Sequence, residues 1–270
     1  MDAGELQQIA RLVEMNRQQL TALGEQIEHL SSALVEHREI ISALSSINTD
    51  KSDKMMIPLG SGTQLIVDNP NNPTGVYCNR HEIETLAKAT SHSGGMLILD
   101  EAYISFVANP WNSLSLLKHS NIILVRSMSK NYANTALRLG YALASADFVS
   151  KLRDIQPDWS VNSLAQKAGI SSLEDYKYLS NARKVVFSSR NYLKTALTAL
   201  GLETIPTDAN FLLIRVDNAA KWRSLLLQKG VVVRDCTSFG LPNYIRVGIR
   251  VVEDCKILVK AITDVTQHTT

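Results

Sequence analysis

Three short apolar runs in the middle of the chain, each followed directly by a polar motif, limit the possible fold more than any other feature. The runs cover residues 65–67, 96–99 and 122–125, with helical patterns between them. This alternation predicts an α/β domain whose strands are largely parallel and covered by helices. Because such sheets bind ligands beyond the carboxyl ends of their strands, the polar motifs are expected to form a site.

The three motifs carry groups that suit an anionic cofactor. They read Asn-Pro-Asn-Asn-Pro-Thr-Gly at 69–75, Asp-Glu-Ala-Tyr at 100–103 and Ser-Met-Ser-Lys at 127–130. Singly, each has an ordinary interpretation: a turn, an aspartate cap and a surface lysine. Ser127, Ser129 and Arg138 together offer hydroxyl and guanidinium groups suited to a phosphate dianion.

In this order and spacing, the motifs resemble the cofactor site of the fold-type I pyridoxal phosphate enzymes, the aminotransferase class I and II family. The resemblance implies that Lys130 bonds to the aldehyde of pyridoxal 5'-phosphate and moves protons at the substrate carbon. It also implies that Asp100 pairs with the pyridine nitrogen, while Tyr103 and Asn72 reach the phenolic oxygen. Ser127, Ser129 and Arg138 would then hold the cofactor phosphate.

Further matches bear on the type of enzyme. Residues 156–162 and 130–133 resemble threonine-phosphate decarboxylases of cobalamin synthesis, and 233–239 also resembles histidinol-phosphate aminotransferases. We favour the decarboxylase and keep the aminotransferase as the alternative, with a small phosphorylated amino acid or amine as substrate. Arg246 matches the arginine that grips the substrate carboxylate or its substitute. Arg234 is either a contact for the substrate phosphate or a solvated arginine.

The carboxyl-terminal part predicts a smaller α+β domain. Residues 163–200 have a helical pattern, and 253–265 have the pattern of a closing helix. Strands are expected at 211–216, 231–234 and 244–247. We therefore predict a partial cofactor-binding large domain at 65–160, followed by connecting helices and a small domain at 161–270.

The amino-terminal segment has a different pattern. Apolar residues follow alternating steps of three and four from Leu6 to Leu44, interrupted on that seam only by Asn16 and His37. Such a heptad seam predicts a coiled-coil helix roughly 60 Å long that needs a partner. With Ile-Pro-Leu-Gly-x-Gly at 57–62, it resembles the alpha subunit of archaeal prefoldin, so 1–64 is predicted to be a prefoldin-like helix and short strand.

The predicted enzyme part is truncated. Ahead of the asparagine-proline motif, the family has the first large-domain strands, a Gly-rich phosphate turn and an aromatic residue that stacks on the cofactor. We do not find these in the sequence. Three interpretations follow: an enzyme-derived domain that keeps a cofactor site and works as a homo-oligomer, a coiled-coil binding or chaperone-like subunit with an inert enzyme remnant, or a junction made by rearrangement.

Composition excludes several other functions. The formal charge of +2 comes from scattered charges of both signs, so no nucleic-acid partner is expected. Three cysteines without Cys-x-x-Cys spacing predict reduced thiols and no metal site. No apolar run reaches the roughly 18 residues that span a bilayer, and no leader pattern is evident, so we expect a cytoplasmic protein without a membrane partner.

Overall fold

The computed structural model describes residues 57–59 and 62–267, and the structural statements below concern these residues. The chain divides into two units, residues 1–52 and 53–270. The predicted coiled-coil helix lies outside the described residues, so it stays a prediction. The fold described here is that of the second unit.

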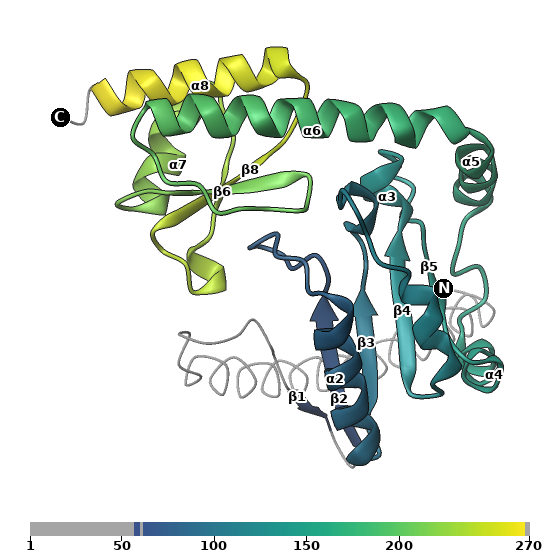
Figure 1. The fold of residues 1–270 in the computed structure, drawn as a ribbon. Coiled ribbons are helices and arrows are strands. Elements are labelled where there is room, and N and C mark those ends of the chain that lie inside the picture. Colours follow the sequence, from purple (N-terminus) through teal and green to yellow (C-terminus); the bar gives the residue numbers. More distant parts are fainter. Residues whose placement is uncertain (1–56, 60–61, 268–270) are drawn as a thin grey trace, which may run out of the picture. The chain divides into compact units, whose positions relative to one another are not determined.

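The first half of this unit is built around a five-stranded sheet with the spatial order β1-β2-β3-β4-β5 (Figure 1). The inner strands β2, β3 and β4 are parallel, and both edge strands are antiparallel to their neighbours. All three strands predicted from the apolar runs are confirmed. The bounds are β1 Ile57–Leu59, β2 Gly62–Asp68, β3 Met96–Asp100, β4 Ile122–Ser127 and β5 Gly140–Leu143.

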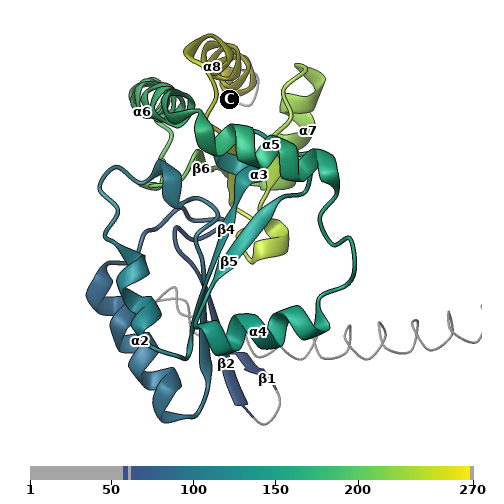
Figure 2. The ribbon, with the colours of Figure 1, turned by 90° about the vertical axis from the view of Figure 1, so that its right-hand side faces the viewer.

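Helix α2 (Arg80–His92) covers one face of this sheet and forms a core with it. Figure 2 shows α2 on one side of the sheet, with α4 (Ala146–Ile155) on the other. On the α2 side, Leu65 and Leu97 are fully buried. Ile66, which points the opposite way, keeps 37% of its surface exposed. The sequence predicted a sheet covered by helices. Among the described residues, helices cover the sheet completely only on the α2 side.

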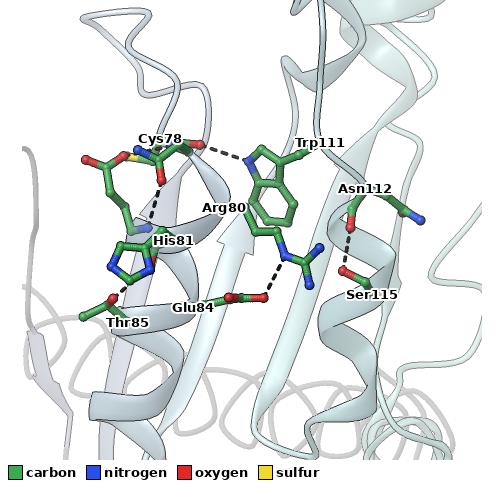
Figure 3. Close-up of polar contacts among 10 residues, drawn as sticks. Cys78, Arg80, His81, Glu84, Thr85, Trp111, Asn112 and Ser115 are labelled. Atoms are coloured by element: carbon green, nitrogen blue, oxygen red, sulfur yellow. Dashed lines mark hydrogen bonds and ion pairs between the residues drawn. The ribbon is translucent and has the colours of Figure 1, made fainter.

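A network of polar contacts fixes the loop between β2 and α2. Asn79 and Glu82 form a capping box at the first turn of α2. The buried Asn69 side chain accepts a hydrogen bond from the backbone N–H of Cys78 at 2.7 Å. The Trp111 indole donates to the Cys78 carbonyl at 3.1 Å, as Figure 3 shows. These contacts hold the asparagine-proline motif at the carboxyl end of β2.

The helical pattern predicted at 163–200 is confirmed. It forms two helices, α5 (Ser163–Glu174) and α6 (Tyr176–Ala199). The break falls at Asp175, whose side chain accepts hydrogen bonds from the first backbone N–H groups of α6. A capping aspartate thus starts a second helix where the apolar pattern runs on.

The small domain contains a three-stranded antiparallel sheet with the order β6-β8-β7. It packs with α6, α7 and α8 into a second core, and α6 lies beside α8 (Figure 1). The strands are β6 Phe211–Arg215, β7 Arg234–Asp235 and β8 Tyr244–Gly248, and the further helices are α7 Ala219–Gln228 and α8 Val252–Gln267.

One strand prediction was largely wrong. The apolar run 231–234 is strand only at its end, because β7 begins at Arg234. The backbone N–H of Val231 instead bonds to the Leu226 carbonyl at 2.9 Å, which closes the end of α7. A backbone N–H that bonds to the end of a helix cannot also bond to a neighbouring strand. The start of the run therefore caps α7 and does not join the sheet.

Helix α6 connects the two halves of the unit. The Arg190 guanidinium donates to the carbonyl of Ala209 at 2.7 Å and to that of Phe106 at 3.5 Å. Arg183 donates to the carbonyl of Val107 at 2.9 Å. The segment after β3 and the segment before β6 are therefore joined through one helix. No helix among the described residues has the length and apolar character to cross a membrane.

Candidate active site

Four of the residues predicted from the sequence line one cavity of about 500 Å³. They are Lys130 after β4, Tyr103 after β3, Arg234 on β7 and Arg246 on β8. The cavity therefore lies where the large sheet meets the small sheet. The four predicted residues supply an amine, a phenol and two guanidinium groups, a set suited to an anionic ligand that carries a carbonyl or amine.

Arg246 is held by contacts from both halves of the unit. Its guanidinium donates to the side-chain oxygen of Asn72, in the loop after β2. It also lies 5.0 Å from the centre of the Phe211 ring, within cation–π distance. The edge of that ring in turn meets Tyr103, with 5.0 Å between the ring centroids. Two predicted site residues, Asn72 and Arg246, are thus in direct contact.

Asp100 lies beside a second carboxylate, Asp68. The two residues are register partners at the ends of β2 and β3. The pKa of Asp68 is raised to about 6, mainly by burial and also by the Asp100 charge, while a backbone hydrogen bond from Asn72 acts in the opposite direction. Asp100 itself accepts a hydrogen bond from the Ala102 N–H at 2.8 Å. The aspartate cap considered from the sequence is therefore present, and it leaves one Asp100 oxygen for other contacts.

Tyr103 connects this carboxylate pair to Arg246. Burial raises the pKa of Tyr103, while the positive charge of Arg246 lowers it and the charges of Asp100 and Asp68 raise it further. The phenol is therefore within electrostatic reach of all three groups. Its proton is held tightly, which suits a hydrogen-bond donor more than a base.

Lys130 lies on α3 (Met128–Asn131), a single helical turn directly after β4. Its side chain is exposed and lines the cavity described above, together with a neighbouring cavity of about 660 Å³. Ser127 caps this turn, because its Oγ accepts from the Ser129 N–H at 3.2 Å. The hydroxyls of Ser127 and Ser129 also bond to each other at 2.6 Å. This local structure presents Lys130 at the carboxyl end of the strand, as predicted.

Arg138 is one of five predicted residues that do not line this cavity; the others are Asn72, Asp100, Ser127 and Ser129. Its guanidinium is exposed and donates to the Thr135 carbonyl at 3.1 Å. Its backbone has φ of +56°, a left-handed conformation that is uncommon for a residue with a side chain. Arg138 lies shortly before β5, as the motif predicts. Its side chain nevertheless does not reach this cavity.

Sequence reasoning missed several residues at this site. Asp68 is the last residue of β2, and its neighbour Asp100 could be recognised only once the strand register was known. Arg223 lies on α7 in no recognisable motif, yet it lines the cavity. Phe211 and Phe239 lie against the guanidinium groups, Phe239 at 5.3 Å from Arg234. Nothing in the sequence signalled that these aromatic rings would contact arginine side chains.

Comparisons with known proteins identify the family of the chain. The family model described as "Aminotransferase class I and II" matches residues 47–262. The chain belongs to this family. The match begins ahead of residue 65, where the sequence analysis placed the start of the enzyme-like part. The family depends on pyridoxal 5'-phosphate, the cofactor predicted from the motifs.

Relatives of this chain include histidinol-phosphate aminotransferases and an L-threonine-O-3-phosphate decarboxylase. Histidinol-phosphate aminotransferase 1 of Nitrosococcus oceani is 36% identical over 203 residues, which cover 73% of this chain and 54% of that protein. Among solved structures, the histidinol-phosphate aminotransferase of Clostridium acetobutylicum has a TM-score of 0.71 and 26% identity, with 76% of this chain and 64% of that one covered. The L-threonine-O-3-phosphate decarboxylase of Porphyromonas gingivalis has a TM-score of 0.67, with the same identity and coverage.

Two consequences follow for this family member. The chain spans about half the length of the curated relatives it matches, 54% in the case of the Nitrosococcus protein. The histidinol-phosphate alternative is supported at least as well as the decarboxylase that the sequence favoured. The likeness to prefoldin concerns residues that the structure largely leaves undescribed, and it stays a prediction.

Proposed function

We propose that the chain binds pyridoxal 5'-phosphate at Lys130 and that this site acts on a small phosphorylated amine or amino acid. One observation carries the proposal: Lys130, Tyr103, Arg234 and Arg246, which come from four separate segments, line a single cavity. A cavity of about 500 Å³ is within the usual range for small-molecule sites.

The groups present fit the cofactor at its polar positions. When bound, pyridoxal phosphate supplies an aldehyde that reacts with amines and a ring that withdraws electrons from the substrate carbon. Asp100 has a carboxylate oxygen free to pair with a ring nitrogen, because its hydrogen bond to Ala102 uses only Oδ1. Tyr103 and Asn72 supply the donors for the phenolic oxygen. The Lys130 amine holds the aldehyde and moves the proton at the substrate carbon.

The phosphate end requires a local change. Ser127 and Ser129 have their hydroxyls paired with each other, and each can turn to an added anion without losing the cap of α3. Arg138 would have to leave the Thr135 carbonyl to reach that anion. We propose these three residues as the cofactor phosphate contacts, with Arg138 as the one that rearranges.

The substrate class follows from the guanidinium groups. Arg246 and Arg234 line the cavity together with Arg223, and their charges suit a substrate phosphate or carboxylate. Histidinol phosphate is the first candidate substrate because of the names of the curated relatives, and threonine phosphate is the second. A homo-oligomer, which would bring a second copy to the site, is part of the proposal and is tested by sedimentation of the purified chain.

The deciding experiment is the absorption spectrum of the purified chain with added pyridoxal phosphate. We expect a visible band that survives gel filtration and is absent from Lys130→Ala. Borohydride reduction of the imine should abolish this band and leave the pyridoxyl group covalently attached to the peptide that contains Lys130. Lys177→Ala is the matched control, because Lys177 lines the neighbouring cavity only. A spectrum identical to free cofactor, or equal labelling of both variants, would overturn the proposal.

Substrate choice is then measured on the loaded chain. Amine transfer from histidinol phosphate without release of carbon dioxide would identify the aminotransferase. Release of carbon dioxide from threonine phosphate would identify the decarboxylase. Arg246→Gln should lower the affinity for either substrate at least tenfold, because a bidentate charged contact is lost.

A further inference from the structure

Asp68 and Asp100 are a pair of carboxyl groups at the same edge of the large sheet. They are the last residues of two parallel neighbouring strands and are aligned with each other in the register. Register partners place their side chains on the same face, and both residues alternate with Leu65, Val67, Leu97 and Leu99, which face α2. The two carboxyl groups therefore project side by side from the face that α2 does not cover.

The charged and polar groups around Asp68 are few in the described part of the chain. Asp100 approaches it from β3, Tyr103 from the segment after β3, and the backbone N–H of Asn72 from its own loop. The positive group that acts on Tyr103 in this cluster is Arg246, on β8, and its guanidinium is engaged with Asn72. Among the described residues, no positive side chain lowers the pKa of Asp68, and two adjacent carboxylates without a cation cannot both ionise easily.

We propose that Asp68 is a positioning residue that, in mildly acidic solution, holds a proton beside Asp100 until a cation reaches the pair. The cation is the ring nitrogen of the cofactor, so this part rests on the proposed function. When the positive charge arrives, the O–H bond of the Asp68 carboxyl breaks, the proton passes to solvent, and both carboxylates face one cation. No electrons are transferred to or from the pair.

The chemistry gives the pair a purpose beyond that of a single aspartate. A lone Asp100 would attract any cation at all times. With Asp68 protonated, the pair carries no more negative charge than a lone Asp100 before the cofactor enters. It carries one more negative charge afterwards, which strengthens the hold on a protonated ring nitrogen. Cofactor binding is then coupled to proton release.

The first test uses the chain without any cofactor. Carbon-13 NMR of labelled aspartate carboxyls follows each group with pH, and the signal lost in Asp68→Asn identifies Asp68. We expect it to titrate near 6, well above the ordinary 3.8 of an aspartate. Asp158→Asn, an exposed loop residue, is the matched control for assignment. An Asp68 signal that titrates at or below the ordinary value overturns the proposal. If Asp68→Asn does not fold, Asp68→Glu provides the assignment instead.

The second test counts protons during binding. Pyridoxamine 5'-phosphate cannot bond to Lys130, so calorimetry in two buffers of different ionisation heat reports proton release without covalent chemistry. At about pH 5.5 we expect the wild-type chain to release up to roughly three-quarters of a proton more than Asp68→Asn. Equal counts overturn the proposal. A chain that binds neither form of the cofactor contradicts the proposed function, while the carboxyl titration still decides whether Asp68 holds the proton.

Discussion

The side-chain oxygen of Asn72 accepts a hydrogen bond from the Arg246 guanidinium, which joins the loop after β2 to the central strand of the small sheet. The two residues are 174 positions apart in the chain. Each was selected from its own motif as part of one site. Their contact shows that the motifs converge, and it makes Asn72 a link between the two sheets as well as a candidate cofactor contact.

Replacing Asn72 by alanine should destabilise the chain. The contact is partly buried and involves a charged donor, so its loss leaves Arg246 with one partner fewer. We expect the free energy of unfolding to fall by about 1–3 kcal/mol. Urea denaturation followed by tryptophan fluorescence measures it. Asn72→Asp is the control, because it keeps an oxygen acceptor and should retain the stability while the added negative charge weakens phosphate binding. Equal stability of wild type and Asn72→Ala would contradict the role as a link.

Gly75 cannot be replaced without strain. Its backbone has φ of +77°, and a Cβ placed there would lie 2.7 Å from the Cβ of Thr207. The Gly75 carbonyl also accepts from the Asp208 N–H at 2.8 Å, so the backbone there is fixed. We expect Gly75→Ala to cost about 2–5 kcal/mol from backbone strain and overpacking together.

Gly94→Ala is the matched control for that substitution. Gly94 also has a positive φ, of +68°, but an added Cβ there meets nothing within 4 Å. It should cost only the backbone strain, about 1–2 kcal/mol. The difference between the two variants, measured by chemical denaturation, isolates the contact with Thr207. If both variants lose the same stability, close packing between the β2 loop and residue 207 is not what requires glycine.

The ion pair between Arg126 and Glu101 should be sensitive to the loss of one partner. Arg126 Nε lies 2.8 Å from Glu101 Oε2, and the Glu101 side chain has 0% exposure. Arg126→Met leaves that carboxylate buried without its counter-charge, which should cost about 3–5 kcal/mol at neutral pH. Arg126→Met combined with Glu101→Leu should recover much of the loss, because no uncompensated charge remains.

An exposed ion pair provides the comparison for Arg126. Arg215 and Glu203 lie 3.0 Å apart, but their side chains are 58% and 57% exposed. Arg215→Met should therefore change the free energy of unfolding by no more than about 1 kcal/mol. Urea denaturation of Arg126→Met and Arg215→Met measures the two losses in the free energy of unfolding. Similar losses in the two variants would show that burial does not determine the strength of the Arg126 pair.

Local sequence patterns predicted the strands and the cavity residues that follow them, because burial and strand ends leave signals in the chain itself. Lys130 and Tyr103 directly follow apolar strands, and both reach the cavity. Asp68 could not be recognised in this way, since its importance comes from strand register. The motif identified Arg138 as a candidate, but the direction in which its guanidinium points depends on the left-handed backbone conformation of this residue. The motif does not reveal that conformation. Arg223 depends on how α7 packs, which no local pattern records.

Stability should depend on pH through Asp68. An unfolded aspartate has a pKa of 3.8, and in the folded chain burial and Asp100 raise it to about 6. Between these values the folded state binds more protons than the unfolded state, so this contribution is fully present below 3.8 and is lost as pH rises through 6. Asp68→Asn has no such loss, so its stability relative to wild type should improve across this window and then stay constant. Urea denaturation of both chains at a series of pH values measures the difference, with Asp158→Asn expected to run parallel to wild type. Parallel curves for Asp68→Asn and wild type would mean that the carboxyl pair does not hold the extra proton in the folded chain.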